Sequence, residues 1–283
     1  MPTIRVYHSG VTAGIPPMKN DHKRAVRSDV TGWSSKSARN QTKWLYSVEV
    51  NELSGYGLAF TFTVRDCPSD AKSWTSIRRA FLKRLERAGL VRYHWLTEWQ
   101  RRGVPHLHGC AYFDFDKLSQ KTTYPPNFLV DHWLSVAGKY GPAGHCQKVN
   151  EITDMQGWLK YLAKHASRGI KHYQRQNVNV PEGWQGKTGR MWGKTGEWPD
   201  DRQYQFSVSD NKGFWVFRRL VRSWRKAYAR DNNVNWIPGA RTMLKCPDKA
   251  FSQVRGVSEW INRDLSISML TVVGSMGFDV RQI

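Results

Sequence analysis

The chain has 283 residues, 40% of them hydrophobic, which is enough for one large domain or two modest ones with a buried core. Its formal net charge of +21 points to a polyanionic partner such as nucleic acid, because each neutralised phosphate releases a counterion. The four cysteines are far apart and form no Cys-x-x-Cys pair, which excludes a zinc ribbon and argues against a disulfide framework. Since no stretch has the apolar length of a signal peptide or a membrane span, we expect a cytoplasmic protein with no membrane partner.

Residues 1–43 contain eight lysines and arginines against two aspartates and show no sustained apolar period. A proline pair at 16–17 and a polar run at 34–43 interrupt the stretch further. We therefore expect a basic, flexible arm here. Such an arm suits either a solvated tail or an accessory contact to nucleic acid.

Residues 44–205 are expected to form the main domain, in which strands and helices are mixed. Alternating apolar, aromatic and β-branched residues predict strands at 44–50, 57–65, 91–99, 104–113 and 204–209. A 3.6-residue apolar period predicts helices at 71–89, about 127–138 and about 154–167. Glycine, proline and tryptophan predict a loop at 181–199.

Residues 206–283 are expected to be a basic helical C-terminal region. Its clearest element is a predicted helix at 212–230, which carries seven lysines and arginines and no acid. This helix could bind DNA, or it could pack on the core through its apolar side with a basic face that is merely solvated. The arginines that we expect to contact DNA across the whole chain are Arg101, Arg102, Arg168, Arg218, Arg222 and Arg225.

The segment "EWQRRGVPHLHGCAYF" at 98–113 places two histidines one residue apart on a predicted strand. Side chains alternate along a strand, so His106 and His108 share a face. If the two strands form a hairpin centred near Arg102, then Glu98 faces His106, with Cβ atoms roughly 4.5–5.5 Å apart. One carboxylate and two imidazoles on one patch predict a divalent metal site with open positions. A solvated polar face, a non-haem iron site and a hydrolytic zinc site remain open at this point.

The predicted helix at 154–167 contains Tyr161 and Lys164, which lie three residues apart and share a helical face. A tyrosine hydroxyl is able to attack a phosphodiester and form a covalent phosphotyrosyl intermediate. Lys164 would stabilise developing negative charge on the phosphate or the phenolate. The Tyr-x-x-Lys pattern is common in ordinary amphipathic helices, so its interpretation depends on the metal-type strand before it.

Together these motifs resemble those of the HUH endonucleases, and in particular the rolling-circle replication initiators, or Rep proteins. The family's three ordered motifs are matched by "FTFT" at 60–63, "HLH" at 106–108 and "YLAK" at 161–164, with Glu98 on the preceding strand as the acidic ligand. The length and the loop "GRMWGKTGEWP" also resemble the initiators of filamentous single-stranded DNA phages, which would place the protein in the cytoplasm of a bacterial host.

The resemblance implies an α+β fold, in which a central antiparallel sheet of the ferredoxin-like or RRM-like kind carries flanking helices and a C-terminal extension. It implies Mg²⁺ or Mn²⁺ held by Glu98, His106 and His108. It further implies site-specific nicking of single-stranded origin DNA to initiate rolling-circle replication, with the 5′ phosphate left on Tyr161. A second transesterification would rejoin the displaced strand.

The sequence departs from relatives in two places. Many use the tyrosine pair Tyr-x-x-x-Tyr, but position 165 is His165, so we predict a single-tyrosine enzyme with Tyr173 as a weaker second candidate. No Gly-x-x-x-x-Gly-Lys-[Ser/Thr] loop is present, so a host helicase would have to unwind the duplex. A transposase or plasmid relaxase, a non-catalytic RRM-like nucleic-acid-binding module and the oligomeric state are left open.

Overall fold

The computed structural model describes residues 1–15, 29–114, 127–159, 162, 173–232 and 256–283. The chain divides into two compact units, and each is described by itself. The central unit consists of Ala25–Thr42 and Val50–Pro199, and the terminal unit consists of Met1–Arg24, Lys43–Glu49 and Asp200–Ile283. In the described part of the chain, no helix has the length and apolar character needed to cross a membrane.

The central unit is built on an antiparallel sheet with the strand order β6-β3-β5-β4-β7. Its strands are β3 (Tyr56–Thr63), β4 (Leu90–Trp99), β5 (Pro105–Phe113), β6 (Lys148–Glu151) and β7 (Trp192–Gly196). The chain order β3-α2-β4-β5-α4-β6 is the β-α-β-β-α-β arrangement of ferredoxin-like folds. The predicted α+β class with a central antiparallel sheet is confirmed, and the His-Leu-His strand β5 lies in the middle of the sheet.

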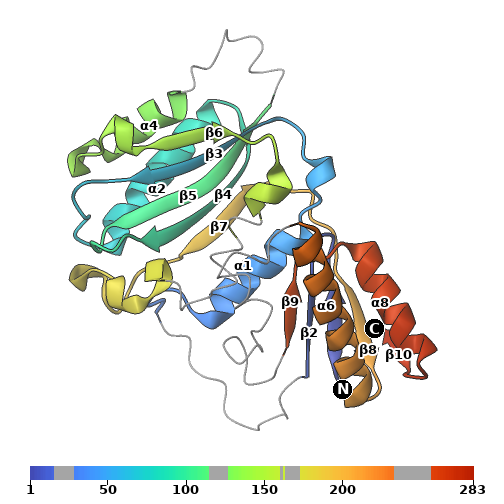
Figure 1. Cartoon of the computed structure of the whole chain (residues 1–283). Helices are drawn as coiled ribbons and strands as arrows, with labels where there is room; N and C mark the ends of the chain where they lie inside the picture. Colours follow the sequence, from blue (N-terminus) through green and yellow to red (C-terminus); the bar gives the residue numbers. More distant parts are fainter. Residues whose placement is uncertain (16–28, 115–126, 160–161, 163–172, 233–255) are drawn as a thin grey trace. The chain divides into compact units, whose positions relative to one another are not determined.

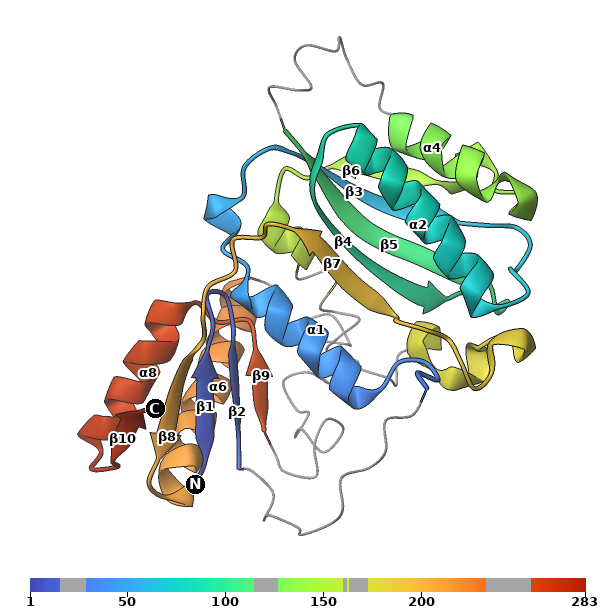
Figure 2. The same cartoon turned by 180° about the vertical axis from the view of Figure 1, so that it is seen from behind.

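Helices α2 (Ala71–Arg87) and α4 (Phe128–Ala137) lie on one face of this sheet, as Figure 2 shows. The predicted apolar period of α2 is confirmed, because Trp74, Ile77, Phe81 and Leu85 are buried. Asp70 caps the first turn by accepting from the Ser73 backbone N–H at 2.6 Å. After the last turn Gly89 adopts φ +92°, a left-handed conformation that favours glycine.

Aromatic rings from strands and helices form the core between the sheet and these helices. Phe62 stacks on Trp133 with ring centroids 5.2 Å apart, and Phe81 meets Phe60 and Phe62 edge to face. Because side chains alternate along β3, Phe60 and Phe62 point toward the helices and Thr61 points to the opposite face. The same alternation places Leu107 in the core and both histidines on that opposite face.

Shorter elements complete the central unit. The 3₁₀ turns are η1 (Val50–Glu52), η2 (Gly138–Tyr140), η3 (Gly144–Cys146), η5 (Tyr173–Arg175), η6 (Asn177–Asn179) and η7 (Glu182–Trp184). Residues 155–159 are helical, within the stretch where a helix at 154–167 is predicted. Helix α1 (Ser35–Ser47) begins among residues of the central unit and ends among residues of the terminal unit.

The terminal unit contains a second antiparallel sheet with the order β10-β8-β1-β2-β9. Its strands are β1 (Thr3–Val6), β2 (Val11–Gly14), β8 (Tyr204–Val208), β9 (Val257–Glu259) and β10 (Val280–Gln282). Helices α6 (Asn211–Asp231) and α8 (Arg263–Ser275) cover one face of it (Figure 1). The core between them includes Ile4, Val6, Phe214, Phe217 and Leu270.

The expectation of a flexible arm at 1–43 is wrong for the residues that form β1, β2 and the start of α1. β1 and β2 have four residues each, too few to show a period, and β1 pairs with β8, about two hundred residues later in the chain. The polar run contains a helix start, where Ser34 accepts from the Ser37 N–H at 3.1 Å. The strand predicted at 44–50 is also wrong, because 44–47 complete α1.

Two further expectations differ from the structure. The C-terminal region predicted as helical also supplies β9 and β10, and β8 lies at its boundary. The stretch 181–199, predicted as a loop, contains β7, whose Gly193 and Gly196 allow the strand to lie close against β4. The expected division into 44–205 and 206–283 therefore differs from the two units, since the terminal sheet takes strands from both ends of the chain.

Candidate functional site

The β4–β5 hairpin has the register that the sequence predicts. Glu98 pairs with His106, and Leu96 pairs with His108. The turn is closed by two backbone hydrogen bonds, from Gln100 N to Val104 O and from Gly103 N to Gln100 O, both 2.9 Å long. Glu98, His106 and His108 therefore lie on the sheet face away from α2 and α4.

Two of the three candidate ligands converge in a buried environment. Glu98 is fully buried and His108 is 4% exposed, whereas His106 is half-buried. Glu98 Oε2 lies 3.7 Å from His108 Nε2, and the rings of His106 and His108 have centroids 4.4 Å apart. Among the described residues, no three His, Cys, Asp or Glu side chains meet closely enough to enclose a metal ion.

Thr61, in the centre of the "FTFT" strand, holds the ring of His108. The Thr61 hydroxyl lies 3.0 Å from His108 Nδ1. When Nδ1–H donates to this hydroxyl, Nε2 presents its lone pair toward Glu98. Such a contact to the distal ring nitrogen orients histidine ligands in metal sites and fixes their tautomer. Thr63, two residues later on the same strand face, instead accepts from Gln100 Nε2 at 2.9 Å.

Arg175 is a residue of the site that the sequence did not indicate. Its Nε donates to Glu98 Oε1 at 2.6 Å, and both side chains are fully buried. The guanidinium carbon lies 3.9 Å from the ring centroid of Trp33, whose Nε1 donates to the Thr97 carbonyl at 2.8 Å. Burial lowers the pKa of Arg175, and the Glu98 carboxylate partly offsets that effect. A single arginine 77 residues from its partner gives no sequence pattern that could have found it.

Two more titratable side chains lie on the same face of the sheet. Burial lowers the pKa of His94 to about 3, and the positive charges of Arg175 and Lys194 act in the same direction. Burial raises the pKa of the Cys110 thiol to about 12, and a hydrogen bond with Trp158 opposes the rise. The sheet face beside Glu98 and His108 is therefore dry, and its His94 imidazole is neutral at physiological pH.

The residues present have the donor chemistry of a divalent metal site. An imidazole nitrogen and a carboxylate oxygen face each other, the imidazole is oriented by Thr61, and the second carboxylate oxygen is held by Arg175. His106 is the least buried of the three candidate ligands, and its ring lies against that of His108. Glu98, His106 and His108 therefore remain the predicted ligands.

The predicted nucleophile and its partners, Tyr161, Lys164 and Arg168, lie outside the described residues. The described residues next to Tyr161 and Lys164 in the sequence include Leu159 and Leu162, which are fully buried. The backbone of Tyr173, the second candidate, begins the 3₁₀ turn η5 that ends at Arg175.

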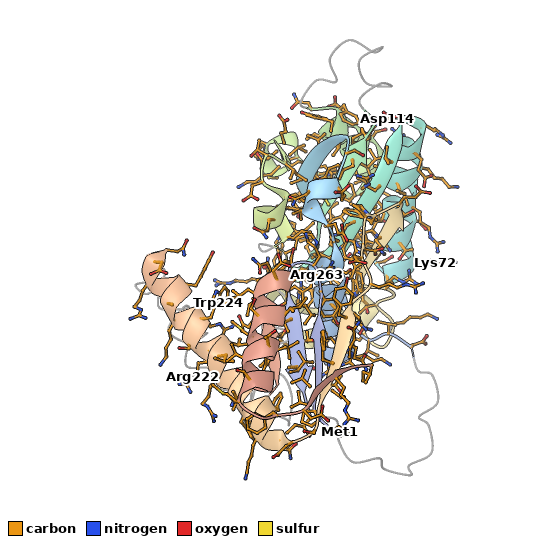
Figure 3. All side chains as sticks on the ribbon, turned by 90° about the vertical axis from the view of Figure 1, so that its right-hand side faces the viewer. Met1, Lys72, Asp114, Arg222, Trp224 and Arg263 are labelled. Carbon is orange, nitrogen blue, oxygen red and sulfur yellow. The ribbon has the colours of Figure 1, made fainter. Side chains whose placement is uncertain are left out.

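Five of the six predicted DNA-contacting arginines lie among the described residues. Arg101 and Arg102 in the hairpin turn and Arg222 on α6 are exposed, and Arg222 stands at the surface of its helix in Figure 3. Arg102, Arg218 and Arg225 make side-chain contacts within the protein. The guanidinium of Arg102 donates to Gln100 Oε1 and to two carbonyls at the end of β3, Arg218 lies 5.4 Å from the Trp215 ring, and Arg225 pairs with Glu259.

Helix α6 also presents basic residues that the prediction did not select. Arg219, Lys226 and Arg230 are exposed and lie at helical spacing from Arg222, so the four form one basic stripe along the helix. Phe214, Phe217 and Val221 are buried on the opposite side. Counting the helical period outward from these apolar residues would have separated the exposed arginines from the engaged ones.

Known proteins with sequences similar to this chain are replication proteins. The family model for replication-associated protein ORF2/G2P matches residues 57–179, from the second residue of β3 to a point beyond β6 and Arg175. A provisionally named replication protein of Xylella fastidiosa strain 9a5c is 42% identical over 99% of both chains. The replication-associated protein G2P of Pseudomonas phage Pf3 is 40% identical, also over 99% of both. No solved structure gives a significant match. Likeness at this level over the whole length shows that the chain belongs to the replication-associated protein ORF2/G2P family.

Proposed function

We propose that the protein is a metal-dependent DNA nickase and strand transferase that initiates rolling-circle replication. The observation that carries this proposal is the β4–β5 register, which places Glu98 opposite His106 with its Oε2 3.7 Å from His108 Nε2. Burying a carboxylate beside an imidazole is costly, and the binding of a metal ion would explain why both are there. The family membership and the net charge of +21 favour phosphate chemistry over iron chemistry.

In this proposal Glu98, His106 and His108 hold Mg²⁺ or Mn²⁺. When bound, the ion would act as a Lewis acid on the scissile phosphate. The chain's own part is orientation: Thr61 fixes the ring of His108, and Arg175 fixes the carboxylate of Glu98. Dry surroundings strengthen each of these electrostatic contacts.

Tyr161 is the proposed nucleophile. Its phenolic oxygen would form a bond to the phosphorus while the bond to the 3′ oxygen of the preceding nucleotide breaks. The 5′ phosphate would stay on Tyr161, and the released 3′ hydroxyl would take a proton and prime synthesis. At neutral pH only about one in a thousand unperturbed tyrosine side chains is ionised. In this proposal Lys164 therefore stabilises the phenolate form of Tyr161. Attack by a 3′ hydroxyl on the phosphotyrosine would reverse the step and close the displaced strand.

The alternative of a non-catalytic RRM-like binding module is disfavoured by the core. Such modules stack bases on exposed aromatic residues of the sheet. Here Phe60 and Phe62 are 1% and 0% exposed and lie under α2 and α4. A transposase or relaxase would use the same site, and the match to a phage replication protein favours the initiator role. Single-stranded origin DNA and a host helicase are the proposed partners, in the cytoplasm of a bacterial host.

A cleavage assay tests the proposal. The full chain is incubated with Mn²⁺ and overlapping labelled single-stranded segments of the replicon that encodes it. We expect one segment to form a covalent protein–DNA adduct that survives denaturing electrophoresis. Glu98→Gln should lose the adduct, whereas Glu151→Gln, at an exposed glutamate on the same sheet, should keep it. Adduct formation by Glu98→Gln at the wild-type rate would refute the metal assignment.

A further inference from the structure

Glu98 has an opposite charge beside it inside the protein without any bound ion. Glu98 contributes one negative charge, Arg175 contributes one positive charge, and both side chains are 0% exposed. Their contact is short, 2.6 Å from Arg175 Nε to Glu98 Oε1.

We propose that Arg175 is an internal counter-ion of Glu98, which weakens divalent cation binding in the absence of DNA. This inference rests on the proposed function, because it assumes that Glu98 is a ligand. It extends that function by making metal affinity depend on the negative charge that a DNA phosphate brings. Arg175 acts through Glu98, so it is a positioning residue and not a catalytic one.

The need for a counter-ion follows from the burial of Glu98. A buried carboxylate with no opposite charge is strongly unfavourable, and Arg175 removes that cost in the metal-free protein. A divalent cation bound to Glu98 would remove the same free-energy cost. The arginine and the cation therefore stabilise the buried carboxylate in the same way. The arginine therefore takes away part of the free energy that cation binding would otherwise release.

The surroundings of Arg175 keep it in place when a cation arrives. Trp33 stacks on its guanidinium at 3.9 Å, and Trp33 is itself tied by its Nε1 to the carbonyl of Thr97, the residue before Glu98. Gly32 packs against Asn177, so the segments before Trp33 and after Arg175 also meet. A guanidinium held this way stays beside the carboxylate and repels a second cation in a dry environment.

The two terminal nitrogens of Arg175 supply a second, independent observation. Nη1 and Nη2 are buried and form no hydrogen bond within the described part of the structure. An arginine that served only to brace the fold would be expected to use these donors on nearby carbonyls. Here the guanidinium is held by one carboxylate and one aromatic face, which is the arrangement of a charge partner for Glu98.

Mn²⁺ titration followed by electron paramagnetic resonance tests the inference on the full-length protein without DNA. We expect Arg175→Gln to bind Mn²⁺ at least tenfold more tightly than wild type, because the repelling charge is gone. Arg175→Lys retains the charge and should stay within threefold of wild type. Adding uncleavable single-stranded DNA should tighten Mn²⁺ binding less in Arg175→Gln than in wild type.

The outcomes separate this inference from the function on which it rests. If wild type binds Mn²⁺ and Glu98→Gln does not, but Arg175→Gln shows no gain, only the counter-ion role is overturned. If wild type binds no Mn²⁺ even when uncleavable single-stranded DNA is present, the metal site fails and this inference fails with it. Should Arg175→Gln be unfolded without metal, Mn²⁺ must fold it, as seen by circular dichroism, because the cation replaces the lost charge. A variant that stays unfolded in saturating Mn²⁺ would contradict the inference.

Discussion

Replacing Thr61 with valine should weaken metal binding without disturbing the fold. Valine has nearly the same shape, so the change removes the hydroxyl 3.0 Å from His108 Nδ1 and little else. His108 is 4% exposed, so its Nδ1 would lose a buried partner at a cost of about 1–3 kcal/mol. Loss of such an orienting contact lowers metal affinity roughly 10- to 100-fold, about 1.4–2.7 kcal/mol.

Isothermal titration with Mn²⁺ measures this effect directly, and Thr63→Val supplies a matched control. Thr63 lies on the same strand and face, but its hydroxyl accepts a hydrogen bond from Gln100 Nε2, whereas the contact to His108 Nδ1 is made by Thr61. We expect Thr63→Val to change the Mn²⁺ affinity by less than about threefold. Equal losses in the two variants, or no loss in Thr61→Val, would refute the claim that Thr61 orients a metal ligand.

Two further predictions concern pH and DNA. Burial lowers the pKa of His94 to about 3. Between pH 6.5 and pH 3 His94 is therefore protonated in the unfolded chain but not in the folded chain, so the free energy of unfolding decreases as the pH drops through this range. The loss should be about 2 kcal/mol at pH 5 in urea unfolding and absent in His94→Gln, and an equal loss in that variant would contradict the assignment. Neutralising three residues of the basic stripe on α6 should reduce the slope of log affinity for single-stranded DNA against log salt by about 2, as measured by fluorescence anisotropy. An unchanged slope, or an equal change in a control on α2, would show that the stripe does not bind phosphate. The α6 variant carries Arg219→Gln, Arg222→Gln and Lys226→Gln, and the control carries Lys72→Gln, Arg79→Gln and Lys83→Gln, all at solvent-accessible positions.

Helices and strands that are long enough to show a regular apolar period were predictable from the sequence. The apolar face of α2 and its stop at Gly89 follow from local spacing, and the hairpin register follows from the short turn between β4 and β5. The terminal unit was not predictable, because β1 and β2 have four residues each and β1 is completed by β8, far along the chain. Strand pairing over such distances leaves no local pattern.

The candidate site divides in the same way. Glu98, His106 and His108 are found by alternation and register alone, since their relation is set within one hairpin. Arg175 and Trp33 reach the site through tertiary packing, from positions 77 and 65 residues away from Glu98 in the chain, so only the structure places them beside it. Arg102 and Arg225 show the opposite case, in which residues that look available for DNA are engaged within the protein.

The most direct test of the proposed function is to identify the residue that becomes joined to DNA. Wild type, Tyr161→Phe and Tyr173→Phe are incubated with Mn²⁺ and the labelled single-stranded segment that wild type cleaves, and the adducts are digested and sequenced by mass spectrometry. The proposal predicts a 5′-phosphotyrosyl adduct on Tyr161 in wild type and Tyr173→Phe, and no adduct in Tyr161→Phe. A 5′ adduct on Tyr161→Phe, or one mapped to any other residue of wild type, would contradict it.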